Sequence, residues 1–195
     1  MDRVLGNLER GLVVVISAPA GTGKTTLVRM LCKEFPCVAE SISYTTRAIR
    51  KNEVAGDHYY FISEKEFEAK IQQGEFLEHA KVFNHYYGTS RLQVEAKQKE
   101  GKHVVLVIDT QGALQLMGSY FATFIFIKPP SIDELRRRLQ SRRADTIEAI
   151  EERLSWAATE MSLSDRYDYT IVNQNLDVAY SVLRSILIAE EHKNA

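Results

Sequence analysis

The order of hydrophobic and polar residues predicts buried strands alternating with amphipathic helices. Three runs, at residues 12–16, 104–108 and 124–127, are apolar on both alternating faces, and a shorter run covers 169–172. Such runs are typical of strands covered by helices on both sides of a parallel sheet. The chain between them is long enough for crossover connections. The pattern therefore predicts an α/β fold.

Start and stop signals place helices between these strands. Apolar residues from Leu27 to Phe35 recur at helical spacing, and Pro36 ends the segment. Ser131 and Asp145 are each followed three positions later by glutamate, the pattern of a capping box at a helix start. We expect the last two helices to bury apolar stripes, which are Ile147, Ile150, Leu154, Ala157 and Met161 in the first and Val178, Val182, Leu183 and Ile186 in the second.

Two stretches fit this core poorly. Residues 41–89 hold short alternating segments, a helix near 64–73 and many Tyr and Arg residues, which indicates an inserted substrate subdomain. Residues 136–146 carry five arginines around two helix ends, which indicates a basic flap. We expect one domain over 1–195, with its core at about 1–41, 90–135 and 155–195, the subdomain at about 42–89 and the lid at about 136–154.

Composition and charge exclude several classes of protein. A chain of 195 residues, 45% of them hydrophobic, can bury a core without disulfides. Lys and Arg number 25 against 26 Asp and Glu, which argues against a nucleic-acid partner. No apolar run is long enough to span a bilayer, and no apolar leader segment opens the chain, so we expect the cytoplasm and no membrane partner. Nothing in the sequence indicates the oligomeric state.

The sulfur and imidazole side chains show no metal-binding pattern. Cys32 and Cys37 are five positions apart, which matches neither a zinc knuckle nor a redox motif, so we expect two reduced thiols. The five histidines are scattered without metal-ligand spacing.

A glycine-rich loop joins the first strand to the first helix. It reads Ala18-Pro19-Ala20-Gly21-Thr22-Gly23-Lys24-Thr25-Thr26. Backbone N–H groups in such a P-loop wrap a polyphosphate, and glycines allow the close approach. Lys24 is expected to bridge the β- and γ-phosphates and the Thr25 hydroxyl to bind Mg²⁺. These residues predict an ATP site, although Ala18 replaces the first glycine; the alternative is an ordinary turn with a surface lysine.

A carboxylate follows the second predicted strand. In P-loop proteins an aspartate at this place, here Asp109, commonly orders the water shell of the metal. We therefore expect Mg²⁺ to be held by Thr25, with Asp109 acting through water.

Several segments of the inserted subdomain carry a further pattern. They are Ser43-Tyr44-Thr45-Thr46-Arg47, then Arg50, then Glu53-Val54-Ala55-Gly56-Asp57-His58-Tyr59, then Phe76-Leu77-Glu78-His79-Ala80, then Tyr86-Tyr87-Gly88-Thr89. In order and spacing they resemble the signature set of guanylate kinases. The resemblance covers nearly the whole chain, from the P-loop to Ile171-Val172-Asn173.

The resemblance implies a three-layer P-loop NTPase core with a parallel sheet, an inserted GMP-binding subdomain and a small lid. It also implies an enzyme that transfers the γ-phosphate of MgATP reversibly to GMP and dGMP, as a step in guanine nucleotide recycling. ATP and GMP would be its small-molecule partners. The resemblance also implies roles for single residues. The GMP phosphate would be bound by Arg47, Arg50, Tyr59 and Tyr87, and the guanine base by Ser43, Glu78 and Thr89, with Asp109 nearby. The transferring phosphoryl group would be bound by Lys24, Arg138, Arg142 and Arg153, and the adenine of ATP by Asn173.

These roles agree with the chemistry of the side chains. Guanidinium groups hold phosphate oxygens in a forked geometry. Guanine presents N1–H and N2–H₂ along one edge, and a carboxylate at Glu78 can accept both, whereas adenine presents an acceptor there. Each of these residues alone would be read as a surface charge or a core aromatic. Because they occur together at the spacing of the family motifs, a GMP-binding site is the favoured interpretation. Arg136, Arg137 and Arg143 are equally well read as a solvated helix face.

The sequence departs from the family pattern at three positions. Val107 stands where the family has an aspartate, Ala20 where the P-loop usually has serine, and Arg143 where the lid has glycine. Two alternative functions stay open. The chain could be a guanylate-kinase-like binding module without catalysis, or a kinase for another nucleoside monophosphate.

Overall fold

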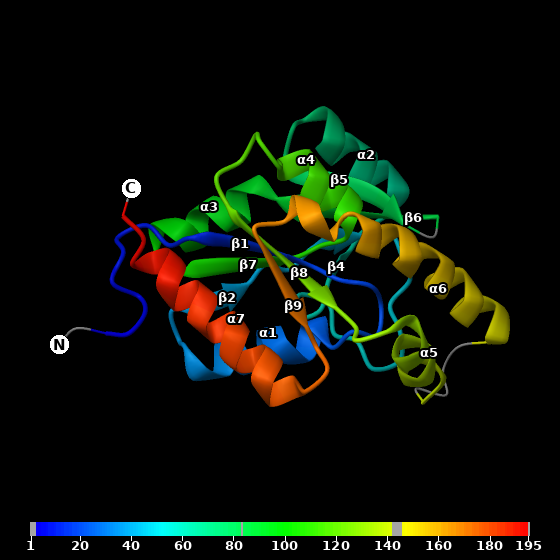
Figure 1. Cartoon of the computed structure of the whole chain (residues 1–195). Helices are drawn as coiled ribbons and strands as arrows, with labels where there is room; N and C mark the ends of the chain where they lie inside the picture. The colour runs from blue at the N-terminus through cyan, green and yellow to red at the C-terminus, as the bar shows by residue number, and fades with distance from the viewer. Residues whose placement is uncertain (1–2, 83, 142–145, 195) are drawn as a thin grey trace.

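Five parallel strands form the central sheet of the protein (Figure 1). The structure is a computed structural model that describes residues 3–82, 84–141 and 146–194. The strand order is β2 (Val38–Glu40), β7 (His103–Val107), β1 (Val13–Ser17), β8 (Thr123–Lys128) and β9 (Tyr169–Val172). Four of these strands were expected from their apolar runs. The strand β2 was not predicted, because three residues are too few to show an alternation of apolar and polar positions.

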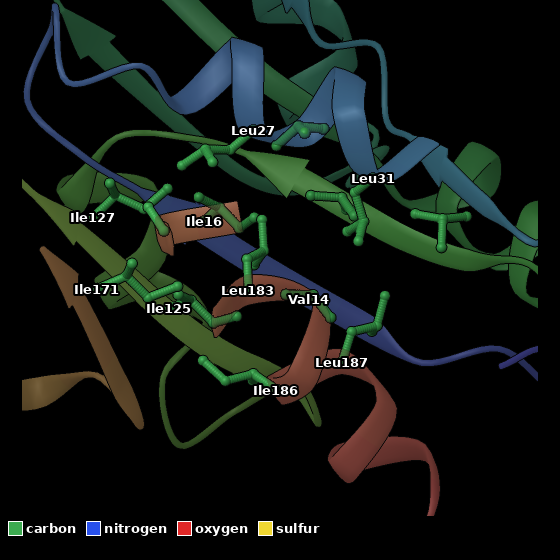
Figure 2. Packing of buried hydrophobic residues seen from close by; sticks show 14 of the residues in the cluster. Val14, Ile16, Leu27, Leu31, Ile125, Ile127, Ile171, Leu183, Ile186 and Leu187 are labelled. Atoms are coloured by element: carbon green, nitrogen blue, oxygen red, sulfur yellow. The ribbon is translucent and has the colours of Figure 1, made fainter. Parts of the chain in front are cut away.

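Helices cover both faces of this sheet, so the core has three layers (Figure 1). On one face Val14 and Ile16 pack against α1 (Lys24–Glu34) and α7 (Leu176–Glu191), as Figure 2 shows. On the other face Val13 and Val15 pack against α3 (Arg91–Lys99) and α4 (Thr110–Leu116). Each fully buried side chain of this size contributes about 1.5–3 kcal/mol. The predicted α/β class with a parallel sheet is confirmed.

A second, mixed sheet stands apart from the first. Its strands follow the order β4 (Tyr60–Phe61), β3 (Tyr44–Thr45), β6 (His85–Ser90) and β5 (Phe76–Val82). The helix α2 (Glu64–Gln72) begins at a capping box formed by Ser63 and Glu66. Its Phe67 is fully buried, with ring centroids 4.5 Å from Phe76 and 5.2 Å from Tyr86. This stacking holds α2 on the sheet and confirms the expected helix.

Two further helices pack on each other through a small apolar cluster. They are α5 (Ile132–Ser141) and α6 (Ile147–Ser162), and the short helix η1 (Ser164–Arg166) follows them. The Ser131 hydroxyl accepts a hydrogen bond from the Glu134 backbone N–H, as expected, whereas α6 is capped by Thr146. Asp145, the expected cap, lies outside the described residues. The domain limits given above stay a prediction, and α5 and α6 run across two of them without a break.

The expected apolar stripes are correct only in part. In α6, Ile150, Leu154 and Ala157 are buried and Met161 is partly buried, but Ile147 is 75% exposed. In α7, Leu183 and Ile186 are buried, while Val178 and Val182 are 60% and 42% exposed. The buried face of α7 includes Ala179 and Leu187 instead, so it is rotated by about one residue from the predicted stripe.

Both cysteines are free and partly buried, as expected.

Within the described ranges, none of the helices combines the length and the apolar character needed to cross a membrane.

Candidate active site

A cavity of about 400 Å³ lies between the carboxyl ends of β1 and β7, the second sheet and α6. Ligands of open α/β sheets bind at this edge of the sheet. Its wall contains the whole expected ATP loop from Ala18 to Thr26. Other expected residues in the wall are Ser43, Arg50, Tyr59, Glu78, Tyr87, Asp109 and Arg153. The fold thus brings most of the predicted site together from segments that are far apart in the chain.

The shape of the loop depends on two glycines in the left-handed region. Gly21 has φ 93° and Gly23 has φ 92°, a conformation that other residues rarely adopt. A Cβ at Gly23 would also lie 2.7 Å from Nδ2 of Asn173, which donates to the carbonyl of Thr22 at 2.6 Å. Asn173 therefore supports the loop from behind and does not line the cavity. Its expected contact with adenine stays a prediction.

Lys24 places a partly buried ammonium group at this loop. Its Nζ donates to the carbonyl oxygen of Ala18 at 3.3 Å. Burial lowers the pKa of Lys24, and the nearby carboxyl groups of Glu160, Asp109 and Glu40 oppose this shift. A buried cation is stabilised by an anion, so the site is suited to bind a polyphosphate.

Asp109 combines a structural contact with a free acceptor. Its Oδ1 accepts a hydrogen bond from the Gly112 N–H at 2.8 Å and so caps α4. Its Oδ2 is buried and has no hydrogen-bond partner among the described residues. Burial raises the pKa of Asp109, and the charge of Lys24 opposes the shift. An orphaned carboxylate oxygen in the same cavity wall as the Thr25 hydroxyl suits Mg²⁺, which prefers oxygen ligands.

Glu78 is a buried carboxyl group in the part of the cavity wall that β5 forms. Only 4% of the residue is exposed, and its Oε1 accepts a hydrogen bond from the Thr89 hydroxyl at 2.5 Å. Burial raises the pKa of Glu78 to about 7, and the charge of Asp109 adds to this effect. Thr89 is fully buried behind Glu78 and does not line the cavity. The two residues act as a pair in which Thr89 orients Glu78.

The expected phosphate-binding residues divide into two layers. Arg50, Tyr59 and Tyr87 line the cavity, whereas Arg47 does not. The Arg47 guanidinium lies 5.4 Å from the ring centroid of Tyr59, and its Nε donates to the Tyr87 hydroxyl at 3.3 Å. Arg47 also forms an ion pair with Glu53, whose side chain accepts from the Arg50 backbone N–H at 2.9 Å.

No role was predicted for Glu53. The sequence did contain a signal for this contact, since an acidic residue follows Arg50 by three positions and Arg47 by six.

The lid arginines occupy different places. Arg153 lines the cavity. Arg138 does not: its Nε donates to Glu134 at 2.8 Å and its Nη2 to the Asn173 carbonyl at 2.9 Å, so it ties α5 to the end of β9. The predicted role of Arg142 and the departure at Arg143 fall on residues outside those described.

At the surface of these helices, Arg136 pairs with Glu151 and Arg137 with Glu134, in agreement with the solvated-face interpretation.

Two residues of α6 in the cavity wall were not predicted. Trp156 and Glu160 lie three and seven positions after Arg153, so one face of the helix presents all three. Burial raises the pKa of Glu160 to about 7; Lys24 opposes this shift and Asp109 supports it. The spacing of Arg153, Trp156 and Glu160 on one helix face is the sequence signal for these two residues. It is less evident than the apolar stripe of α6, which is the stronger pattern.

Comparisons with known proteins agree with this geometry. The sequence profile of the guanylate kinase family matches residues 10–190. The chain is 57% identical over 188 residues to the guanylate kinase of Protochlamydia amoebophila (strain UWE25), covering 96% of this chain and 95% of the relative. The chain belongs to the guanylate kinase family.

Other family members give the same result. The guanylate kinase of Rhodopseudomonas palustris (strain HaA2) is 46% identical over 198 residues, covering 98% of this chain and 90% of the relative. The crystal structure of the guanylate kinase from Anaplasma phagocytophilum matches with a TM-score of 0.78 at 35% identity, covering 97% of this chain and 91% of that one. The family consists of phosphotransferases, so the chain is an enzyme of this class.

Two departures from the guanylate kinase pattern lie in the cavity wall. Ala20 is in the P-loop and Val107 is at the end of β7. Both side chains are apolar, at positions where the family resemblance led us to expect a serine and an aspartate. The acidic residues that do line the cavity are Glu78, Asp109 and Glu160.

Proposed function

We propose that this protein transfers the γ-phosphoryl group of ATP to the phosphate of GMP, giving ADP and GDP, in a reversible reaction that requires Mg²⁺ and also accepts dGMP. One observation supports this most strongly: a single cavity joins the P-loop with Lys24 to the buried carboxyl group of Glu78. The donor and acceptor phosphates would then lie in the same cavity. The proposed metabolic role is guanine nucleotide recycling in the cytoplasm.

The protein groups would act mainly by position and charge. Phosphoryl transfer spreads negative charge over the equatorial oxygens, so fixed cations contribute more than an acid or base would. Lys24 and Arg153, both in the cavity wall, would stabilise this charge, with Arg138 and Arg142 as further lid cations. The transfer is direct and in line, without a covalent intermediate on the protein.

Thr25 and Asp109 would hold Mg²⁺, Thr25 through its hydroxyl and Asp109 through water. The ion would supply charge neutralisation at the phosphates when bound.

The acceptor is selected by its base and held by its phosphate. Glu78 in its ionised form would accept hydrogen bonds from N1–H and N2–H₂ of guanine, with Ser43 beside it. Arg50, Tyr59 and Tyr87 would donate to the phosphate, and Arg47 would support them from behind. Leaving the buried Glu78 carboxylate facing the N1 acceptor of adenine would cost about 10⁴-fold in selectivity.

A direct assay tests the proposal. The protein is mixed with MgATP and one of GMP, dGMP, AMP, UMP or CMP, and the release of ADP is followed. Activity confined to GMP and dGMP is expected. Preference for another base would show a different monophosphate kinase, and absence of activity with binding of GMP would show a binding module. The intact loop residues Gly21, Gly23, Lys24 and Thr25 favour catalysis over the binding module.

A further inference from the structure

Gly112 lies directly against the carboxyl group of Glu78. A Cβ placed on Gly112 would lie 2.2 Å from Oε2 and 3.0 Å from Cδ of Glu78, and 3.4 Å from Oδ1 of Asp109. No real Cβ atom approaches another atom as closely as 2.2 Å. The first turn of α4 therefore has room for Glu78 only because residue 112 has no side chain.

The backbone at this position does not itself require glycine. Gly112 belongs to the helix α4 and is not among the glycines with positive φ in the described chain. Alanine is the better helix former, so glycine here weakens the helix it belongs to. Apart from the helix's own backbone and the two neighbouring residues, the three atoms of the described chain that would lie nearest to the added Cβ all belong to Glu78 and Asp109. The requirement for glycine therefore comes from these carboxyl groups.

Glu78 has little freedom to move away. The Thr89 hydroxyl holds Oε1 at 2.5 Å, and the residue is 4% exposed. A methyl group at position 112 would push the carboxyl group by about 1 Å toward the cavity or turn it away from it, since ordinary contacts need more than 3 Å. Hydrogen bonds weaken steeply outside a narrow range of distance and angle. Such a displacement would spoil a paired contact with one edge of a base.

We propose that Gly112 is a specificity-determining position, whose missing side chain sets the place of the Glu78 carboxylate and thereby the selection of guanine. This inference rests on the proposed contact between Glu78 and the base. Gly112 itself does not touch the substrate and acts as a positioning residue through Glu78.

The experiment compares Gly112→Ala with the wild type in the full chain. The ratio of kcat/KM for GMP to that for AMP is expected to fall at least ~10-fold, with the KM for ATP unchanged. The thermal unfolding midpoint is expected to change little, because the higher helix propensity of alanine offsets part of the cost of displacing the Glu78 carboxyl group. A protein that loses GMP selectivity while keeping its stability would not fit a merely structural role. An unchanged ratio would overturn the inference.

A matched control is available at the other end of α4. Gly118 has φ 76° and nothing within 4 Å of an added Cβ. Gly118→Ala is expected to lower the unfolding midpoint through backbone strain and to leave the GMP to AMP ratio unchanged, the reverse of the result at Gly112. A loss of GMP selectivity in both variants would show that any substitution near α4 lowers selectivity. The assigned role of Gly112 would then be wrong.

A double-mutant cycle separates the inference from the proposed function. Glu78→Ala alone is expected to lower the GMP to AMP ratio, and an unchanged ratio would refute the proposed base contact itself. When Glu78 is already alanine, Gly112→Ala is expected to have no further effect on that ratio. An equal effect of Gly112→Ala in both backgrounds would show that it acts elsewhere, and the inference would then be wrong.

Discussion

The guanidinium of Arg47 is held in a fork by the carboxylate of Glu53. The distances are 2.8 Å from Nη2 to Oε1 and 3.0 Å from Nη1 to Oε2, and the side chains are 11% and 15% exposed. This contact raises the pKa of Arg47 and lowers that of Glu53, so both stay charged near neutral pH. Since Glu53 also binds the backbone of Arg50, one carboxylate orders both arginines of the proposed phosphate site.

Glu53→Gln is expected to weaken phosphate binding. The amide group of glutamine would face donor groups of Arg47, so the fork would open and Arg47 would no longer orient Tyr87. We expect the KM for GMP to rise by about 10-fold and kcat to change by less than about 3-fold, which corresponds to one lost charged contact. Steady-state kinetics with varied GMP measure both values.

Guanosine separates a positioning role from a structural one at Glu53. It lacks the phosphate, so its dissociation constant, measured by calorimetry, should not change in Glu53→Gln. The matched control is Glu75→Gln, which breaks the ion pair with Lys70 in the same subdomain and should leave both ligands unaffected. Equal weakening of guanosine and GMP would contradict the assigned role.

Lys24→Ala is expected to abolish most of the phosphoryl transfer. The variant loses the only lysine in the cavity wall of the described chain, and a cation of this kind contributes about 10³-fold or more to the rate. GMP should still bind, because its proposed contacts lie within residues 43–89, outside the P-loop. Single-turnover kinetics and calorimetry measure the two properties. Lys33→Ala, in the exposed last turn of the same helix, serves as the control. Transfer that persists while GMP binding is lost would reverse the assignment.

The raised pKa of Glu78 predicts how stability depends on pH. In the folded protein its pKa is about 7, against an ordinary value of 4.5, so between these values the folded state binds more protons than the unfolded state. The free energy of unfolding should therefore fall as pH rises from 4.5 to 7, by up to about 3 kcal/mol from this group. Glu160, with a pKa also raised to about 7, contributes in the same direction.

Glu78→Gln removes this titrating group, so it tests whether the free energy of unfolding falls as pH rises. Glutamine resembles the protonated carboxyl group and can still accept from Thr89. We expect the variant to match the wild type near pH 4 and to be more stable by about 2–3 kcal/mol at pH 8. Urea unfolding at a series of pH values measures the difference. Parallel curves for the two proteins would show that Glu78 titrates normally in the fold.

Glu191 joins the two ends of the chain to the main sheet. Its carboxylate accepts from the N–H groups of Gly6 at 2.7 Å and Asn7 at 3.1 Å, and lies 2.6 Å from Nε2 of His103. The Leu12 N–H donates to Nδ1 of this histidine, so Nδ1 carries no proton in this arrangement, and burial lowers the pKa of His103 while Glu191 opposes the shift. Burial opposes ionisation of Glu191, but the hydrogen bonds from Gly6 and Asn7 outweigh it and lower its pKa.

Glu191→Gln is expected to lower stability without lowering kcat. Glutamine turns an amide group toward donors and leaves partly buried N–H groups unpaired, which costs about 1–3 kcal/mol. The loss should be full at pH 7 and shrink as pH falls below 4.5, where the wild-type carboxylate also takes up its proton. Urea unfolding at pH 7 and pH 4 measures this, with the ADP-release assay as control. A fall in kcat equal to that of Lys24→Ala would contradict a purely structural role.

The sequence by itself determined the α/β core and the position of the P-loop. Both depend on local properties: apolar alternation in β1, helical spacing in α1, and glycines at 21 and 23 that adopt positive φ. The order of Arg47, Glu78 and Tyr87 along the chain was enough to indicate the acceptor site, because these residue types at that spacing form a family pattern.

Only the tertiary structure decided which of these groups face the cavity. It placed Arg47 and Asn173 behind the wall, and brought Glu160 of α6 opposite Lys24. It also turned Val178 toward solvent and placed Gly112 against Glu78. Such relationships join residues that are tens to more than a hundred positions apart, and they depend on how rigid elements pack on one another. A local pattern specifies the period of a helix or strand, but the direction of each face is set by the partner against which it packs.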